Sequence, residues 1–279
     1  MTASPRTIFI TGATGGLGRE LARRYAGQPG HLILHGRNPD RLRELAEELS
    51  GGAAEISTVE ADLAELAQVR RLAGDVAKLT DSLSVLVNNA GIGQGRGDRR
   101  EESADGFELR LAVNHLAPFA LTLRLLPLLR AGAPARVVNV ASAAQTPVDF
   151  ADPQLETGYS GSRAYAQSKF AMIATGFHLA GLLPAGEVTV NSLHPATLMP
   201  TAMVAEGWGT TVDDLATGVA ATARLIDSPS LAGVTGRYFF RQEPAEALAE
   251  AHDPRVQRRL WGLSERWSGV SLPGGDLTA

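Results

Sequence analysis

The chain has 279 residues, of which 44% are hydrophobic and 20% charged, and its formal net charge is −4. This composition is typical of an ordinary globular protein, and a slightly acidic chain provides no positive field for nucleic acid. The sequence has no cysteine, which excludes disulfides and thiolate metal sites, and its six histidines lack metal-ligand spacing. We therefore predict no metal site and no nucleic-acid partner.

The first residues, 1–6, lead directly into an apolar segment. They do not resemble a signal peptide, and we find no apolar stretch long enough to cross a bilayer. The sequence therefore predicts a cytoplasmic protein without a membrane partner.

Short apolar segments alternate with helical ones along most of the chain. We predict strands, in chain order, over residues 7–11, 31–35, 56–59, 83–87, 136–140, 188–193 and 237–240. Helices are expected between them, over residues 17–28, 40–49, 63–79, 104–129, 162–183 and 212–225. Short buried strands that alternate with helices favour a parallel sheet covered on both faces.

The predicted fold is α/β: a single doubly wound, Rossmann-type domain over residues 1–279, with a parallel sheet of about seven strands flanked by helices. Residues 196–211 show no clear period and contain Pro200, Gly207 and Gly209. We expect this segment to be a mobile substrate loop, since long irregular loops in compact domains are usually functional. Residues 241–279 are expected to form a C-terminal tail.

A glycine-rich turn follows the first predicted strand, with the sequence TGATGGLG over residues 11–18. Glycine allows a sharp turn and a close approach to a pyrophosphate, which the N-terminus of the following helix attracts. Such turns also serve only to cap helices, but the position between a first strand and a first helix favours a dinucleotide site.

The end of the second strand indicates which dinucleotide is bound. A site for NAD usually has Asp or Glu there, to hold the ribose hydroxyls. This strand ends in His35, Gly36, Arg37 and Asn38, with no carboxylate before Asp40. Because Arg37 can face a 2′-phosphate and Gly36 leaves room for it, we predict NADP rather than NAD. The alternative is that Arg37 is only a solvated residue at the start of a helix.

Tyr165 and Lys169 stand one turn apart in a predicted helix, so both side chains emerge on one face. A phenol is a weak acid with an ordinary pKa of about 10, and a neighbouring cation lowers that pKa. Only Lys78 and Lys169 are lysines among 26 basic residues, which suggests that an ammonium is needed here. The pair is predicted to transfer protons; the alternative is an incidental pair on a surface helix.

Asn114 precedes Pro118 by four residues in a predicted helix. Proline has no N–H, so the carbonyl of Asn114 loses its usual partner and needs another, such as water. We hypothesise that Pro118 exposes this carbonyl for proton transfer. The alternative is that Pro118 only kinks a long helix.

Taken in order, these features resemble the short-chain dehydrogenase/reductase superfamily over about residues 7–240. The glycine-rich turn is similar to its TGxxxGxG cofactor loop, residues 62–63 to its adenine contact, and residues 88–91 to its NNAG segment. Its catalytic tetrad falls on Asn114, Ser142, Tyr165 and Lys169. The predicted cofactor contacts are Gly12, Thr14, Gly15, Gly16, Leu17, Gly18, Arg37, Asn38, Asp62, Leu63, Asn89, Ala90, Gly91, Tyr165, Lys169, Pro195, Thr197 and Thr201.

Two departures narrow the resemblance. Ser142 and Tyr165 are 23 positions apart, whereas most members place them closer together. The extra segment, residues 148–159, and the tail residues 258–265 resemble the retinol-dehydrogenase-like subgroup, many of whose members carry an N-terminal anchor that we do not see here. Gly15 stands where many NADP-using members have Lys or Arg, which leaves Arg37 as the main phosphate ligand.

The resemblance implies an NADP(H)-dependent ketoreductase or alcohol dehydrogenase, in which hydride passes between the nicotinamide and a carbonyl or alcohol carbon. Tyr165 would exchange the proton, Lys169 would lower the Tyr165 pKa and hold the ribose, and Ser142 would hydrogen-bond the substrate oxygen.

The expected substrate is a ketone, aldehyde or alcohol, and the apolar Met199, Met203 and Trp208 favour a lipophilic one. A homo-oligomer is also expected, because members are commonly dimers or tetramers. Two alternatives stay open: a non-catalytic dinucleotide-sensing regulator, and an epimerase or dehydratase on the same scaffold.

Overall fold

Eight strands form one sheet in the computed structural model, which describes residues 6–95 and 97–273. The strand order is β3-β2-β1-β4-β5-β6-β7-β8, and all neighbours are parallel except β7 and β8. The parts of the predicted domain at residues 1–5, 96 and 274–279 lie outside the described residues. The strands are β1 (Arg6–Ile10), β2 (Gly30–Gly36), β3 (Ala54–Glu60), β4 (Val85–Asn88), β5 (Ala135–Val140), β6 (Val188–His194), β7 (Tyr238–Phe240) and β8 (Glu243–Ala245).

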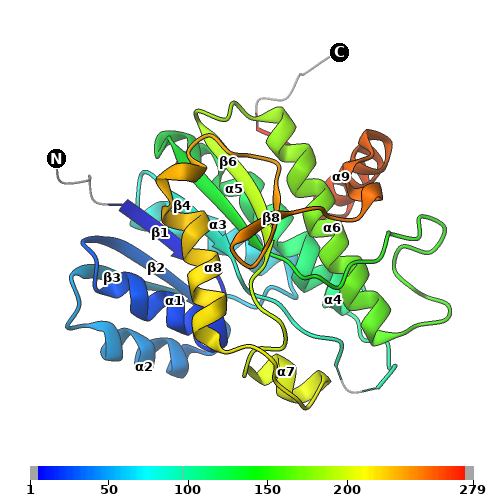
Figure 1. Ribbon diagram of the computed structural model, residues 1–279, viewed down its shortest axis with the longest axis horizontal. Helices are drawn as coiled ribbons and strands as arrows, with labels where there is room; N and C mark the ends of the chain where they lie inside the picture. Colours follow the sequence, from blue (N-terminus) through cyan, green and yellow to red (C-terminus); the bar gives the residue numbers. More distant parts are fainter. Residues whose placement is uncertain (1–5, 96, 274–279) are drawn as a thin grey trace.

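Helices cover both faces of the sheet (Figure 1). On one face α1 packs beside α8, with α2 next to β2 and β3, while α3, α5 and α6 cover the other. The side chains of β1 alternate between the two cores, with Phe9 in one and Ile8 and Ile10 in the other. These helices are α1 (Gly16–Ala26), α2 (Pro39–Leu49), α3 (Leu66–Leu79), α5 (Ala117–Ala131), α6 (Gly161–Leu182) and α8 (Leu215–Asp227).

The strand order reverses between β1 and β4. From β1 the chain runs outward through β2 and β3, and then returns to β4 and continues to the opposite edge. The loops after β1 and β4 therefore leave the sheet toward opposite faces, and a crevice opens at the carboxyl ends of the strands. The predicted doubly wound fold is confirmed, with one strand more than expected.

The additional strand, β8, lies at the edge of the sheet. It pairs antiparallel with β7 after a tight turn in which Arg241 has a φ of +55°. Its sequence, Glu-Pro-Ala, is typical of a loop, and Pro244 is tolerated only because an edge strand needs fewer backbone donors.

The helix predicted over residues 104–129 begins later than expected and is interrupted. α4 (Leu109–Leu111) starts after Glu108, whose carboxylate accepts a hydrogen bond from the Leu111 N–H at 2.7 Å and caps the helix. A π-helix, η1 (Ala112–Leu116), then separates α4 from α5. Apolar residues recur with helical spacing through α4, η1 and α5. The sequence pattern therefore did not reveal the cap at Glu108 or the wider turn of the π-helix.

Two other segments contain more helix than predicted. The substrate loop, residues 196–211, includes the short helix α7 (Ala202–Gly207), which Thr201 caps. The predicted tail contains a 3₁₀ turn, η3 (Ala249–His252), and the helix α9 (Pro254–Ser268). A further 3₁₀ turn, η2 (Pro229–Leu231), follows α8.

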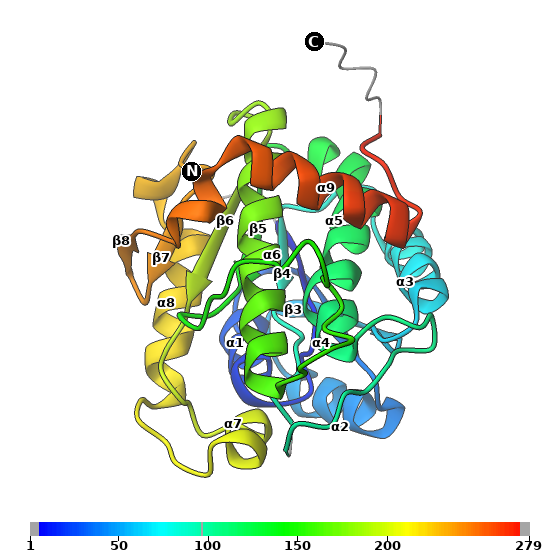
Figure 2. The same ribbon diagram turned by 90° about the vertical axis from the view of Figure 1, so that its right-hand side faces the viewer.

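Figure 2 shows α9 lying across α6 and α5. Leu260 of α9 is fully buried, and the ring of Trp261 meets Phe119 edge-on with the ring centroids 4.9 Å apart. Gly269 ends the helix in the left-handed conformation, with a φ of +65°. The tail is therefore a packed part of the domain.

Within the part of the chain that the structure describes, one helical stretch, Leu109–Ala131, is by length and composition able to cross a bilayer, with a mean hydropathy of 1.3. The expectation that no such stretch exists is therefore wrong. However, 83% of its apolar window is buried inside the protein, because it packs between the sheet, α3 and α9. A buried core helix passes the same test, so this stretch is weak support for membrane contact.

Replacing Leu260 with alanine should lower the free energy of unfolding by about 3 kcal/mol, because a cavity would form between α9 and α6. Urea denaturation measures this loss. Leu79→Ala is the control, since Leu79 ends α3 with 39% of its surface exposed, and it should lose less than about 1 kcal/mol. Equal losses would contradict a docked α9.

Candidate active site

A cavity of about 530 Å³ opens at the carboxyl ends of β1, β4, β5 and β6. Its walls are the loops that follow these strands and those that follow β2 and β3, together with α6 and the segment around α7. The structure brings every predicted site residue to this cavity except Gly18, Asn38 and Asn114. The predicted residues that line the cavity therefore share one space, and their roles in binding and catalysis stay predictions.

The glycine-rich turn has the geometry that only glycine permits. Gly12 has a φ of +67°, and a Cβ on it would lie 2.9 Å from the Cα of Ala90. A Cβ on Gly18 would lie 2.3 Å from the Gly12 carbonyl oxygen, so Gly18 supports the turn by close packing and does not line the cavity. Gly15 precedes α1 without a side-chain cap, which leaves the helix N-terminus to attract a phosphate.

Hydrogen bonds join this turn to the loop after β4. The Thr11 hydroxyl accepts from the backbone N–H groups of Asn89 and Ala90, each at 3.0 Å. The Asn89 amide nitrogen donates to the carbonyl oxygens of Thr11 at 2.8 Å and Gly12 at 3.2 Å. Asn89 therefore lines the cavity and also fixes the turn.

His35 supports the site and was missed by sequence reasoning. It is buried at the end of β2, where Nδ1 accepts a hydrogen bond from the Gly12 N–H at 3.2 Å and Nε2 lies 3.0 Å from the Ala61 carbonyl oxygen. These partners require a neutral ring that carries its proton on Nε2. Burial lowers the pKa of His35 to about 4. The available signal was a histidine at the end of an otherwise apolar strand.

Arg37 lies at the rim of the cavity, with its guanidinium 3.9 Å from the Asp62 carboxylate and its side chain 76% exposed. Asn38 does not reach the cavity; its side chain accepts a hydrogen bond from the first turn of α2 at 3.0 Å and caps that helix. Gly36 lines the cavity, and the room for a 2′-phosphate expected there stays a prediction. A Cβ on Gly36 would lie 2.6 Å from Thr14 Cγ2, so glycine is needed there to let Thr14 pack.

Tyr165 and Lys169 both line the cavity from α6, as predicted. The Lys169 ammonium donates to the Val140 carbonyl oxygen at 2.9 Å and lies 5.9 Å from the centre of the Tyr165 ring. Burial lowers the pKa of Lys169 to about 8. Burial also raises the pKa of Tyr165, and the Ser142 hydroxyl opposes this rise. The net shift at Tyr165 is the reverse of the expected depression.

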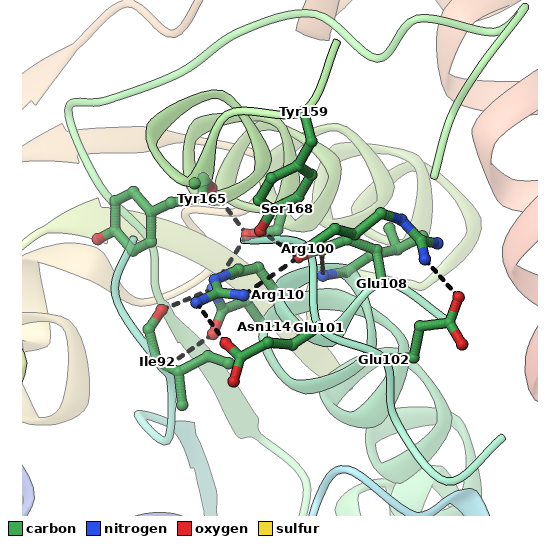
Figure 3. A network of polar contacts seen from close by, with 12 residues as sticks. Ile92, Arg100, Glu101, Glu102, Glu108, Arg110, Asn114, Tyr159, Tyr165 and Ser168 are labelled. Atoms are coloured by element: carbon green, nitrogen blue, oxygen red, sulfur yellow. Dashed lines mark hydrogen bonds and ion pairs between the residues drawn. The ribbon is translucent and has the colours of Figure 1, made fainter. Parts of the chain in front are cut away.

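Asn114 is fully buried and acts on the site through the backbone of Ile92 (Figure 3). Its side chain accepts from the Ile92 N–H at 2.8 Å and donates to the Ile92 carbonyl at 3.0 Å and the Ser168 hydroxyl at 3.0 Å. The helix is irregular here, because Asn114 lies inside η1 and Pro118 follows. The role of the Asn114 carbonyl in proton transfer stays a prediction.

The segment around α7 forms the outer wall. Trp208 stands edge-on to Tyr165, with the ring centroids 5.8 Å apart. The Thr197 N–H donates to the Asp213 carboxylate at 2.7 Å, and a Cβ on Gly16 would lie 2.9 Å from Thr201 Cγ2. Thr197 is thus fixed to Asp213, and Thr201 lies close to Gly16 of the glycine-rich turn.

Comparisons with known proteins agree with this geometry. A family model described as short chain dehydrogenase matches residues 6–210. This chain is a member of the short-chain dehydrogenase family. Human retinol dehydrogenase 13 is 32% identical over 98% of this chain and 87% of that protein, and mouse polyprenol dehydrogenase is 36% identical over 97% and 85%. The structure of the RhlG/NADP complex of Pseudomonas aeruginosa matches at 25% identity, covering 85% of this chain and 95% of the other, with a TM-score of 0.70.

The family is one of oxidoreductases that interconvert carbonyls and alcohols by hydride transfer with a nicotinamide dinucleotide, and the relatives place this chain in the retinol-dehydrogenase-like subgroup. The structure fits such a cofactor. A Cβ at Gly12 would collide with Ala90, the N-terminus of α1 faces the cavity, and polar side chains stand at both ends of it. An enzyme is therefore favoured over the regulator alternative.

Replacing His35 with glutamine should change how stability depends on pH. The unfolded ring takes up a proton near pH 6.5 and the folded ring only near pH 4, so the stability from neutral His35 is complete above pH 6.5 and is lost as pH falls toward 4. The wild-type advantage over the variant should shrink by about 2 kcal/mol between pH 7 and pH 5. Urea denaturation at both pH values tests this, and a constant difference would contradict it.

Proposed function

We propose that this enzyme uses NADP(H) and acts on a lipophilic alcohol, ketone or aldehyde. The preference for NADP(H) is based on the end of β2. Arg37 stands there at the cavity rim, and no carboxylate occupies the position that would hold ribose hydroxyls. The similarity to an NADP complex supports the same preference. Gly12, Gly16 and the α1 N-terminus would hold the pyrophosphate.

Tyr165 is proposed as the acid and base of the reaction. The bound dinucleotide supplies or accepts the hydride. The Tyr165 hydroxyl gives a proton to the substrate oxygen in reduction and takes it back in oxidation. Ser142, buried beside it at the end of β5, holds that oxygen while charge develops. Lys169 holds the ribose from the same helix face, and with a pKa of about 8 it can exchange protons at moderately basic pH.

Apolar side chains in the cavity lining support a lipophilic substrate. Ile92, Met203, Val204 and Trp208 face the cavity beside Tyr165 and offer apolar contact area. Relatives named for retinol and polyprenol, both apolar alcohols, support a lipophilic substrate. The expected cytoplasmic location and homo-oligomer stay predictions, as does the absence of a membrane partner.

Replacing Tyr165 with phenylalanine should reduce kcat by at least about 10³-fold while leaving the Kd for NADPH within a few-fold, because only the exchangeable proton is removed. Turnover of a panel of apolar ketones and alcohols, followed at the nicotinamide absorbance, measures kcat, and fluorescence titration measures the Kd. Substantial turnover by the variant would show that another group moves the proton.

Changing two residues should shift cofactor choice in opposite directions. Arg37→Ala should weaken NADPH binding by about tenfold or more and leave NADH binding nearly unchanged, since one charge pair with a phosphate is removed. Gly15→Arg should strengthen NADPH binding, because the φ of Gly15 is −164° and a Cβ there meets no atom within 4 Å. If wild-type protein binds NADH more tightly than NADPH, the proposed preference is wrong.

A further inference from the structure

Arg110 is a buried guanidinium in the polar network of Figure 3, and it is not among the residues that line the cavity. It is 3% exposed, and its Nε donates to the Gly93 carbonyl oxygen at 3.1 Å. Nη2 donates to Glu101 at 3.0 Å, and Nη1 lies 3.6 Å from the buried carboxylate of Glu108. A buried charge is costly unless it is paired and hydrogen-bonded, so these partners indicate which groups Arg110 fixes.

Gly93 belongs to the segment that Asn114 also holds. Arg110 and Asn114 lie about one helical turn apart, and they bind successive residues of the loop after β4. Asn114 binds both backbone groups of Ile92, and Arg110 binds the carbonyl of Gly93. Arg110 therefore extends the support that the tetrad residue Asn114 gives to the inner wall of the site.

The other side of Gly93 contacts the outer wall. A Cβ on Gly93 would lie 2.8 Å from Met203 Cγ and 3.3 Å from Trp208 Cζ3. The neighbouring Gln94 donates from its side chain to the Gly207 carbonyl oxygen, at the end of α7. Because Trp208 in turn packs against Tyr165, the position of Gly93 bears on the apolar surface next to the acid and base.

The segment between β5 and α6 joins the same network from behind. The Tyr159 hydroxyl donates to the Glu108 carboxylate at 3.0 Å, and the Glu108 N–H donates to the Gln154 side chain at 3.1 Å. Glu108 also caps α4, the helix that carries Arg110. The extra segment between Ser142 and Tyr165 is thereby attached to the charge pair that holds Gly93.

We propose that Arg110 is a positioning residue for the substrate site. It fixes the backbone of Gly93, against which Met203 and Trp208 pack. Through its ion pair with Glu108 it also connects Gly93 to Tyr159 of the extra segment. The inference rests on the proposed function for its kinetic consequence. Without Arg110 the outer wall opens more often, so a lipophilic substrate that needs this wall binds less well, while the proton step at Tyr165 keeps its rate.

Hydrogen exchange tests the proposal without any substrate. Arg110→Gln should speed amide exchange in residues 199–212 by about tenfold or more, because the backbone of Gly93, against which the outer wall packs, is no longer fixed. Arg136→Gln is the matched control: Arg136 donates to the carbonyl oxygens of Leu225 and Ser228, each at 2.9 Å, and neither contact reaches Gly93. The control should exchange like wild type. Equal exchange in residues 199–212 for wild type and Arg110→Gln would overturn the proposal.

Kinetics separates the proposal from the proposed function. Arg110→Gln should raise KM for a long apolar carbonyl by about tenfold, with kcat and the NADPH Kd within about twofold of wild type, while KM for a small ketone changes little. Arg110→Lys, which keeps the charge, should restore part of the loss. A fall in kcat with unchanged KM would overturn the proposal. If wild type turns over no carbonyl or alcohol but the exchange difference appears, the proposed function fails and the positioning role stands.

Removal of Arg110 leaves Glu108 buried without its cation, which destabilises the fold. Should Arg110→Gln fail to fold, the double variant Glu108→Gln, Arg110→Gln removes both charges and is compared in the same measurements. Faster exchange in residues 199–212 supports the proposal in that background, and wild-type exchange overturns it.

Discussion

The near contact between two loops is the constraint on which the site depends. The turn after β1 and the segment after β4 approach so closely that Gly12 and Gly18 have no room for a side chain, and the Asn89 amide binds the turn directly. This contact is possible because β1 and β4 are adjacent parallel strands, so the segments that follow them begin side by side at one edge of the sheet. The cavity opens beside the contact, so the glycine-rich turn, Ser142, Tyr165 and Lys169 share one space.

Patterns in the sequence were enough to predict the sheet and most of the site. Apolar strands between helices determine a doubly wound sheet, and in such a sheet the residues at strand ends must meet at one edge. Ser142 and the glycine-rich turn therefore lie together although they are far apart in the chain. Tyr165 and Lys169 follow from helical spacing alone.

The features that were missed depend on contacts between distant segments. Nothing in the local sequence shows that His35 accepts a hydrogen bond from Gly12. Nor does it show that Thr14 occupies the space that a side chain at Gly36 would need. The direction of the Tyr165 pKa shift depends on burial, which outweighs the effect of a nearby hydroxyl. Helical spacing shows that two groups are close, but it does not show how far each is removed from water.

The position of α9 in the chain has a consequence for biosynthesis. All the strands of the described sheet precede α9 in sequence, yet α9 covers α6 and α5 and buries Leu260 and Trp261 between them. A ribosome therefore completes the sheet before the segment that shields these helices has been made. During that interval the apolar faces of α6 and α5 are exposed to other nascent chains and to chaperones, and they are covered only when α9 docks.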